Sequence, residues 1–140
     1  DLLGRKVVMD GGAGLKLLGA RIESTIEQAL RVKDLTPHAQ ALATALQAVT
    51  TATRAAWASG NPDDALSNAM PYMQAFGHLV IAWIWLELGL AAADSGSDAT
   101  AGRRQAMRYF YAYELPKVAA WLAVVNARDP VCREMRDEWF

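Results

Sequence analysis

The chain has 140 residues, a length typical of one domain, and residues 1–140 are taken as a single unit. Its 14 basic and 15 acidic residues leave a net charge of −1. Nucleic-acid binders and polybasic membrane binders carry an excess of basic residues, so the composition excludes both classes. Ala fills 27 positions while Ile and Val together fill 13, and 53% of the chain is apolar, so the composition excludes an all-β fold and disorder.

The first predicted helix follows the breaker Asp10-Gly11-Gly12 and runs from about Ala13 to Val32. Its apolar positions recur every three or four residues, which predicts one buried stripe. The stripe consists of Leu15, Leu18, Ile22, Ile26 and Ala29.

The second predicted helix runs from Pro37 to about Ser59, with Thr36 expected as its N-cap and Pro37 as its first helical residue. Small apolar residues form its stripe, which consists of Ala39, Leu42, Leu46, Val49 and Ala56. Gly60-Asn61-Pro62 ends this helix, and Asp63-Asp64 is expected to cap the next one.

The third predicted helix, Ala69 to Ala93, is apolar on most sides. One stripe holds Tyr72, Phe76, Leu79, Trp83, Leu86 and Leu90, and a second holds Met73, Val80, Ile84 and Leu88. Such a helix is central to a core, is covered by a partner, or spans a membrane. Because the uninterrupted apolar run from Leu79 to Leu86 is far shorter than the ~20 residues that a span needs, we expect no transmembrane segment.

A loop over Asp94–Asp98 and a fourth helix from about Ala99 to Ala127 complete the pattern. The residues expected to point inward from this helix are Met107, Phe110, Tyr111, Val118, Trp121, Leu122 and Val125. Asp129-Pro130 ends it, and Pro130–Phe140 is expected to be helical. The sequence therefore predicts an all-α fold, an antiparallel up-down four-helix bundle with a short C-terminal helical tail.

The sequence predicts no catalytic, cofactor-binding or metal-ligating residue. Neither His38 nor His78 has an acidic residue three positions before it, as di-iron bundles require, and Cys132 is the only cysteine. That lone cysteine favours a reducing, cytoplasmic location. The segment Gly11–Gly14 lacks the strand and the Lys-Ser/Thr pair of a phosphate loop, so we interpret it as a hinge before a helix.

Glu87 and Glu114 interrupt apolar stripes, where an unpaired charge is costly. Either they are a pair of buried carboxylates with raised pKa values, or each pairs with an arginine on a facing helix. We favour the ion pairs, for which the candidate partners are Arg103, Arg104 and Arg108.

Two prolines fall within helical patterns. Pro71 fits the first turn of a helix capped by Asn68, whereas Pro116 predicts a kink near Ala112–Leu115. The aromatic cluster before Pro116 is expected to serve packing, with a ligand-stacking platform as the alternative. It consists of Tyr109, Phe110, Tyr111 and Tyr113.

Three stretches of the chain resemble acyl-CoA dehydrogenases, and most closely the long bacterial branch related to 3-methylmercaptopropionyl-CoA dehydrogenase. The first resembles the segment just after the catalytic loop, and the other two resemble the C-terminal extension domain of that branch. They are Asp1–Val7 followed by Asp10–Gly12, Asn68–Tyr72 with Phe76–Gly77, and Arg108–Tyr111 with Leu115–Pro116. Since Asp1–Val8 reads as the middle of a helical stretch, we expect the chain to be a fragment of a longer protein.

The resemblance implies a parent flavoprotein that uses FAD to oxidise an acyl-CoA to the 2,3-enoyl-CoA. The catalytic base of many family members lies on the loop before the stretch that Asp1 begins, so no catalytic residue is carried onto this sequence. The expected role is packing against the rest of the dehydrogenase and association of subunits into a homodimer. The alternative is a free-standing, non-enzymatic helical interaction protein.

The third helix has more apolar surface than one core stripe needs. We therefore expect Met73, Val80, Ile84 and Trp85 to point partly away from the core and to form an assembly surface.

Overall fold

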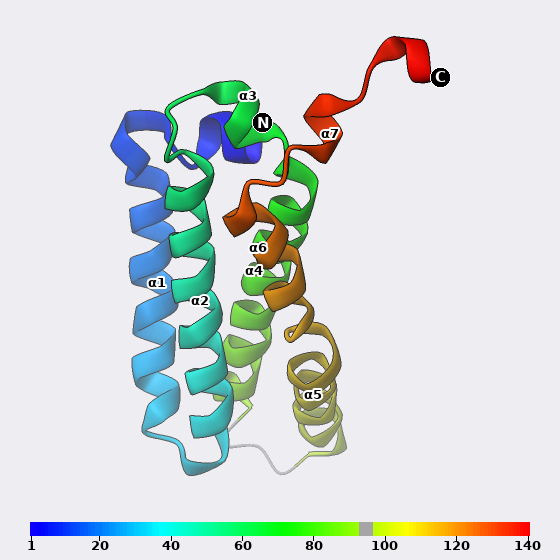
Figure 1. Cartoon of the computed structure of the whole chain (residues 1–140). Helices are drawn as coiled ribbons and strands as arrows, with labels where there is room; N and C mark the ends of the chain where they lie inside the picture. Colours follow the sequence, from blue (N-terminus) through cyan, green and yellow to red (C-terminus); the bar gives the residue numbers. More distant parts are fainter. Residues whose placement is uncertain (93–96) are drawn as a thin grey trace.

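A computed structural model describes residues 1–92 and 97–140, and every regular element within these ranges is helical, which confirms the predicted all-α fold. The long helices are α1 (Ala13–Leu30), α2 (Thr36–Ala56) and α4 (Ala69–Ala91). The fourth arm of the bundle is built from α5 (Asp98–Tyr109) and α6 (Lys117–Ala127). Figure 1 shows these arms running antiparallel along the chain. Helices α2 and α4 pack against each other, with α1 and α6 each contacting both.

The N-terminal segment packs against α3 (Pro62–Leu66) and α4 at one end of the bundle instead of continuing straight into α1 (Figure 1). A π-helical turn covers Leu2–Lys6 and a 3-10 turn covers Met9–Gly12. The side chains of Leu3 and Val7 are buried, and the indole Nε1 of Trp57 donates a hydrogen bond of 3.1 Å to the carbonyl of Leu3. The predicted breaker before α1 is confirmed, since Asp10, Gly11 and Gly12 all have positive φ (51°, 65° and 81°).

Two predicted helix caps are wrong. Thr36 is inside α2, where its hydroxyl donates back to the carbonyl of Val32 and leaves the N-cap role to the backbone of Leu35. The short helix α3 (Pro62–Leu66) is capped by Asn61, whose side chain accepts from the Asp63 N–H at 2.9 Å. Asp63 and Asp64 lie in its first turn, where their charges favour the helix N-terminus.

The predicted loop Asp94–Asp98 falls mostly outside the described residues, as does the expected last residue of the third helix, Ala93. Within the described part, the side chain of Ser97 accepts from the Thr100 N–H and caps α5.

The irregularity predicted at Pro116 is confirmed, and it divides the expected fourth helix. A π-helical turn, η4 (Phe110–Glu114), joins α5 to α6, and the Leu115 N–H reaches back to the carbonyl of Phe110 at 2.9 Å. Pro116 has no N–H to donate, so the regular hydrogen-bond ladder is interrupted here. Pro71 lies in the first turn of α4 and Asn68 occupies its N-cap position, as predicted, but the Asn68 side chain donates to the carbonyl of Asp129 and makes no cap hydrogen bond.

The core holds most of the predicted stripes. The buried members include Ile22, Ile26, Leu42, Val49, Tyr72, Leu79, Leu86, Met107, Tyr111, Val118, Leu122 and Val125. Phe110 and Trp121, expected inside, are only partly buried. The predicted helical tail is confirmed as α7 (Val131–Glu134) and a 3-10 turn at Asp137–Trp139, which extend away from the bundle (Figure 1).

Candidate functional site

The outward side of α4 carries a continuous apolar surface, which we name the α4 face. The face consists of five residues whose side chains are 40–62% exposed: Met70, Met73, Ile81, Ile84 and Leu88. At about 100° per residue these positions fall within an arc of roughly 80°, and they extend over about 27 Å of helix. The opposite side of α4 carries the buried residues Tyr72, Leu79 and Leu86. The α4 face is therefore additional to the core.

The side chains expected to point partly away from the core are exposed or half-buried in the structure. Met73 and Ile84 are about half exposed, and Val80 and Trp85 are half-buried beside them. Ile81 and Leu88 add to this surface: Leu88 was placed on the second apolar stripe, and Ile81 was not singled out. Leaving such side chains in water forfeits roughly 1.5–3 kcal/mol for each one that a partner could bury. A contiguous exposed apolar surface of this kind is a candidate association surface.

Among the described residues, α4 is also the one helix long and apolar enough to cross a membrane by length and composition. Its buried side packs against α1, α2 and α6 in the bundle. The outward side is exposed and apolar.

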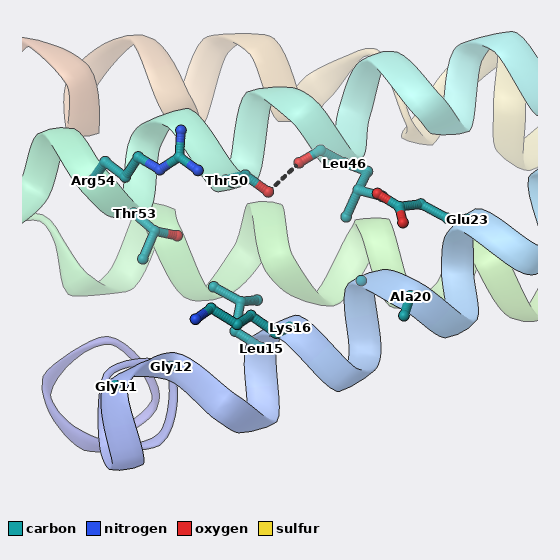
Figure 2. A pocket seen from close by; sticks show the side chains of 11 residues that line it. Gly11, Gly12, Leu15, Lys16, Ala20, Glu23, Leu46, Thr50, Thr53 and Arg54 are labelled. Carbon is teal, nitrogen blue, oxygen red and sulfur yellow. Dashed lines mark hydrogen bonds between the residues drawn. The ribbon is translucent and has the colours of Figure 1, made fainter.

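A groove between α1 and α2 is the second feature of the surface (Figure 2). It consists of two adjoining cavities of about 410 and 490 Å³ that share Glu23, Leu46, Thr50 and Arg54. Gly11, Gly12 and Lys16 line one end, and Glu27 lines the other. Thr50 turns its hydroxyl back to the carbonyl of Leu46 at 2.9 Å, so it offers the groove little hydrogen-bonding capacity.

The predicted alternatives for Glu87 are both wrong. Glu87 is exposed on α4, and its carboxylate lies 3.2 Å from the buried hydroxyl of Thr25, which can donate its one proton either to Glu87 or to the Arg21 carbonyl, also 3.2 Å away. The same hydroxyl accepts from the Trp83 indole at 2.8 Å. Glu87 therefore continues a structural hydrogen-bond chain between α1 and α4.

Glu114 is part of an ion pair, but not with an arginine. Lys117 Nζ lies 2.7 Å from its carboxylate and His78 Nε2 lies 3.5 Å away. The hydrogen bond from Lys117 holds the pKa of Glu114 below its ordinary value, partial desolvation opposes that shift, and His78 assists it. Since its pKa is lowered, Glu114 is an ionised partner and not a neutral acid. His78 also contacts the rings of Phe110 and Trp121.

The predicted arginine partners lie elsewhere. Arg104 and Arg108 line a cavity of about 450 Å³ together with His38 and Asp34, and Arg103 is exposed outside it. Burial lowers the pKa of His38, while the Asp34 backbone opposes the shift and the Arg108 charge adds to it. His38 also packs edge-on against Tyr111, with ring centroids 5.0 Å apart.

The aromatic cluster before Pro116 divides between two environments. Tyr111 is buried and donates to the carbonyl of Ala82 at 2.9 Å, and burial raises its pKa. Tyr109 and Tyr113 stack on each other at 4.9 Å and are more than half exposed. Within the described residues no three His, Cys, Asp or Glu side chains gather as a metal site would need, and Cys132 is exposed.

Sequence reasoning missed the buried N-terminal turn and the arginine-lined cavity. The apolar spacing of Leu3 and Val7, four residues apart, was a usable signal for the former. No sequence signal places Arg104 beside His38, because that proximity depends on how α5 packs across the start of α2.

Comparison with known families finds a match. A family described as "Acetyl-CoA dehydrogenase C-terminal like" matches residues 18–136, which covers all the long helices except the first turn of α1. Neither a curated protein nor a solved structure matches the chain.

Proposed function

Because the chain belongs to the acetyl-CoA dehydrogenase C-terminal-like family, we propose that it is the C-terminal helical domain of a longer acyl-CoA dehydrogenase. The parent enzyme uses FAD to oxidise an acyl-CoA to the 2,3-enoyl-CoA. The domain itself serves packing and subunit association, most simply in a homodimer. The observation that carries this role is the α4 face, which presents five exposed apolar side chains on a helix already packed on its other side.

The finer assignments are part of the same proposal. The stretches Asn68–Tyr72 and Arg108–Tyr111 support the bacterial branch related to 3-methylmercaptopropionyl-CoA dehydrogenase. A cytoplasmic location is supported by the single cysteine.

The described residues do not fit the flavin that the parent uses. The groove between α1 and α2 has the required size, but Lys16 and Arg54 are balanced there by Glu23 and Glu27, so its lining has no net positive charge to attract a diphosphate. No step of the dehydrogenation is therefore assigned to this domain, and flavin binding is assigned to the rest of the parent.

The direct test is to purify the longer protein that contains this sequence, beside the 140-residue chain alone. The proposal predicts a yellow parent that reduces an electron-accepting dye with an acyl-CoA, and a colourless, inactive chain. A parent without flavin or acyl-CoA oxidation overturns the enzymatic assignment and leaves the alternative of a free-standing helical interaction protein.

A matched pair of variants tests the role of the α4 face in that parent. Ile84→Glu places a charge in the face and should release subunits or destabilise the parent. Gln40→Glu, which adds the same charge at an exposed position of α2, should leave assembly unchanged. Equal behaviour of the two variants would contradict the assigned role.

A further inference from the structure

The three arginines of α5 lack the carboxylate partners that the sequence suggested. Among the described residues, Arg103, Arg104 and Arg108 form no ion pair. Arg108 donates a 3.3 Å hydrogen bond to Gln105 on the same helix, but this amide is neutral and does not balance the charge. The two acidic candidates, Glu87 and Glu114, are taken by Thr25 and Lys117. Cations without a counter-charge are available to an external anion.

Two of these arginines face one cavity. Arg104 and Arg108 lie one helical turn apart and line the 450 Å³ cavity between α5 and the start of α2, which we name the α5 pocket. Its other polar lining residues are Asp34, His38 and Gln105. The size is within the range of small-molecule sites. The Nε atom of Arg104 is buried and has no hydrogen-bond partner among the described residues, so this guanidinium keeps an unsatisfied donor.

The base of the α5 pocket is rigid. Its apolar lining residues Leu35 and Met107 are almost fully buried and both pack against Gly89 of α4. A Cβ added at Gly89 would lie 2.7 Å from the Met107 sulfur, so the Met107 side chain of α5 packs directly on this glycine. The two arginines are therefore held by a packed element and not by a loop.

The donor set selects among anions. Two guanidinium groups, His38 and the Gln105 amide supply more hydrogen-bond donors than the two oxygens of one carboxylate can satisfy. A phosphate group offers three strong acceptor oxygens and more negative charge. Asp34 opposes an anion, but the two arginines leave the lining with a net positive charge.

We propose that the α5 pocket binds the phosphate group of a small molecule, with Arg104 and Arg108 as its principal ligands. Arginine suits this role because its planar fork of donors matches phosphate oxygens in pairs. If the proposed function holds, the acyl-CoA substrate of the parent supplies such a group as a phosphate ester, and free phosphate is the other source of the same chemistry.

The test is calorimetric titration of the 140-residue chain with inorganic phosphate, with coenzyme A, and with dephospho-coenzyme A, which lacks the phosphate monoester. A preference for coenzyme A over dephospho-coenzyme A of tenfold or more identifies the ester as the ligand. Saturable binding of inorganic phosphate without that preference identifies free phosphate. The phosphate measurement is independent of whether the parent is a dehydrogenase.

The variants make the proposal specific to this pocket. Arg104→Gln and Arg108→Gln should each weaken binding at least tenfold, and Asp34→Asn should tighten it. Arg103→Gln removes the same charge from the same helix outside the pocket and should have no effect. Absence of binding by any phosphate compound, or equal losses in Arg103→Gln and Arg104→Gln, would overturn the proposal. Circular dichroism checks that each variant folds.

Discussion

Single polar residues in this protein connect helices. The hydroxyl of Thr25 is buried in α1, accepts from the Trp83 indole and donates toward Glu87, so three side chains join α1 to α4. Thr53 and Tyr72 make an equivalent buried contact of 2.7 Å between α2 and α4. Buried polar groups that find partners in this way specify how the helices pack without a large net gain in stability.

Replacing Thr25 tests the first of these connections. Thr25→Val keeps the shape of the side chain but leaves the half-buried Trp83 N–H without an acceptor, so we expect a loss of about 1–3 kcal/mol in the free energy of unfolding. Thr44→Val is the control, because Thr44 is exposed and bonds only within its own helix. That control should change stability by about 0.5 kcal/mol or less. Urea unfolding followed by circular dichroism compares the two, and equal losses would contradict the role of Thr25.

Glu114 gives a prediction with a defined pH dependence. Its pKa is lowered in the folded chain, so the ionised carboxylate stabilises the fold above its ordinary pKa, and this contribution disappears as the pH falls through the lowered value. Glu114→Gln should therefore lower the urea midpoint slightly near neutral pH, and the two proteins should converge once the pH has fallen below the lowered pKa of Glu114. A midpoint difference that persists unchanged at acid pH would show that the ion pair with Lys117 is not its cause.

At the scale of elements, α4 contacts α5 at Gly89, where the Met107 side chain packs on the glycine. Alanine in place of a helical glycine normally gains about 0.5–1 kcal/mol. At Gly89 the new Cβ meets the Met107 sulfur at 2.7 Å, and overpacking of a core costs about 1–3 kcal/mol. We expect Gly89→Ala to lower the thermal midpoint.

Gly77→Ala is the matched control on the same helix, because nothing lies within 4 Å of a Cβ at that position. It should raise the thermal midpoint. If both alanine variants shift the midpoint in the same direction, the close approach at Gly89 does not limit the packing of α5.

Helix periods and breakers were readable from the sequence, whereas caps and hydrogen-bond partners were not. The three- and four-residue spacing placed α1, α2 and α4 to within a few residues at each end. Pro116 predicted a break, but the form of that break, a π-helical turn at Phe110–Glu114, depends on tertiary packing of Tyr111. Thr36 fits a cap by residue type, yet its hydroxyl found a carbonyl one turn earlier.

At the scale of the whole molecule, the predicted bundle is confirmed. The α5 pocket could not be predicted, because helix periodicity does not say which side chains of different helices meet. The excess of apolar residues on the third helix predicted the α4 face correctly, because a bundle core needs only one stripe. The partners of Glu87 and Glu114 were predicted wrongly, since residues at the border of a stripe reach solvent or a neighbour on their own side. The nearest cation to Glu114 is Lys117, only three residues along the chain.

The central claim is that the α4 face is an association surface, and sedimentation equilibrium of the 140-residue chain tests it most directly. With the face uncovered, the chain should self-associate at tens of micromolar, and Ile84→Glu should shift it toward the monomer without loss of helicity, whereas Gln40→Glu should not. A single species of 15.2 kDa for the unmodified chain at that concentration would contradict the claim.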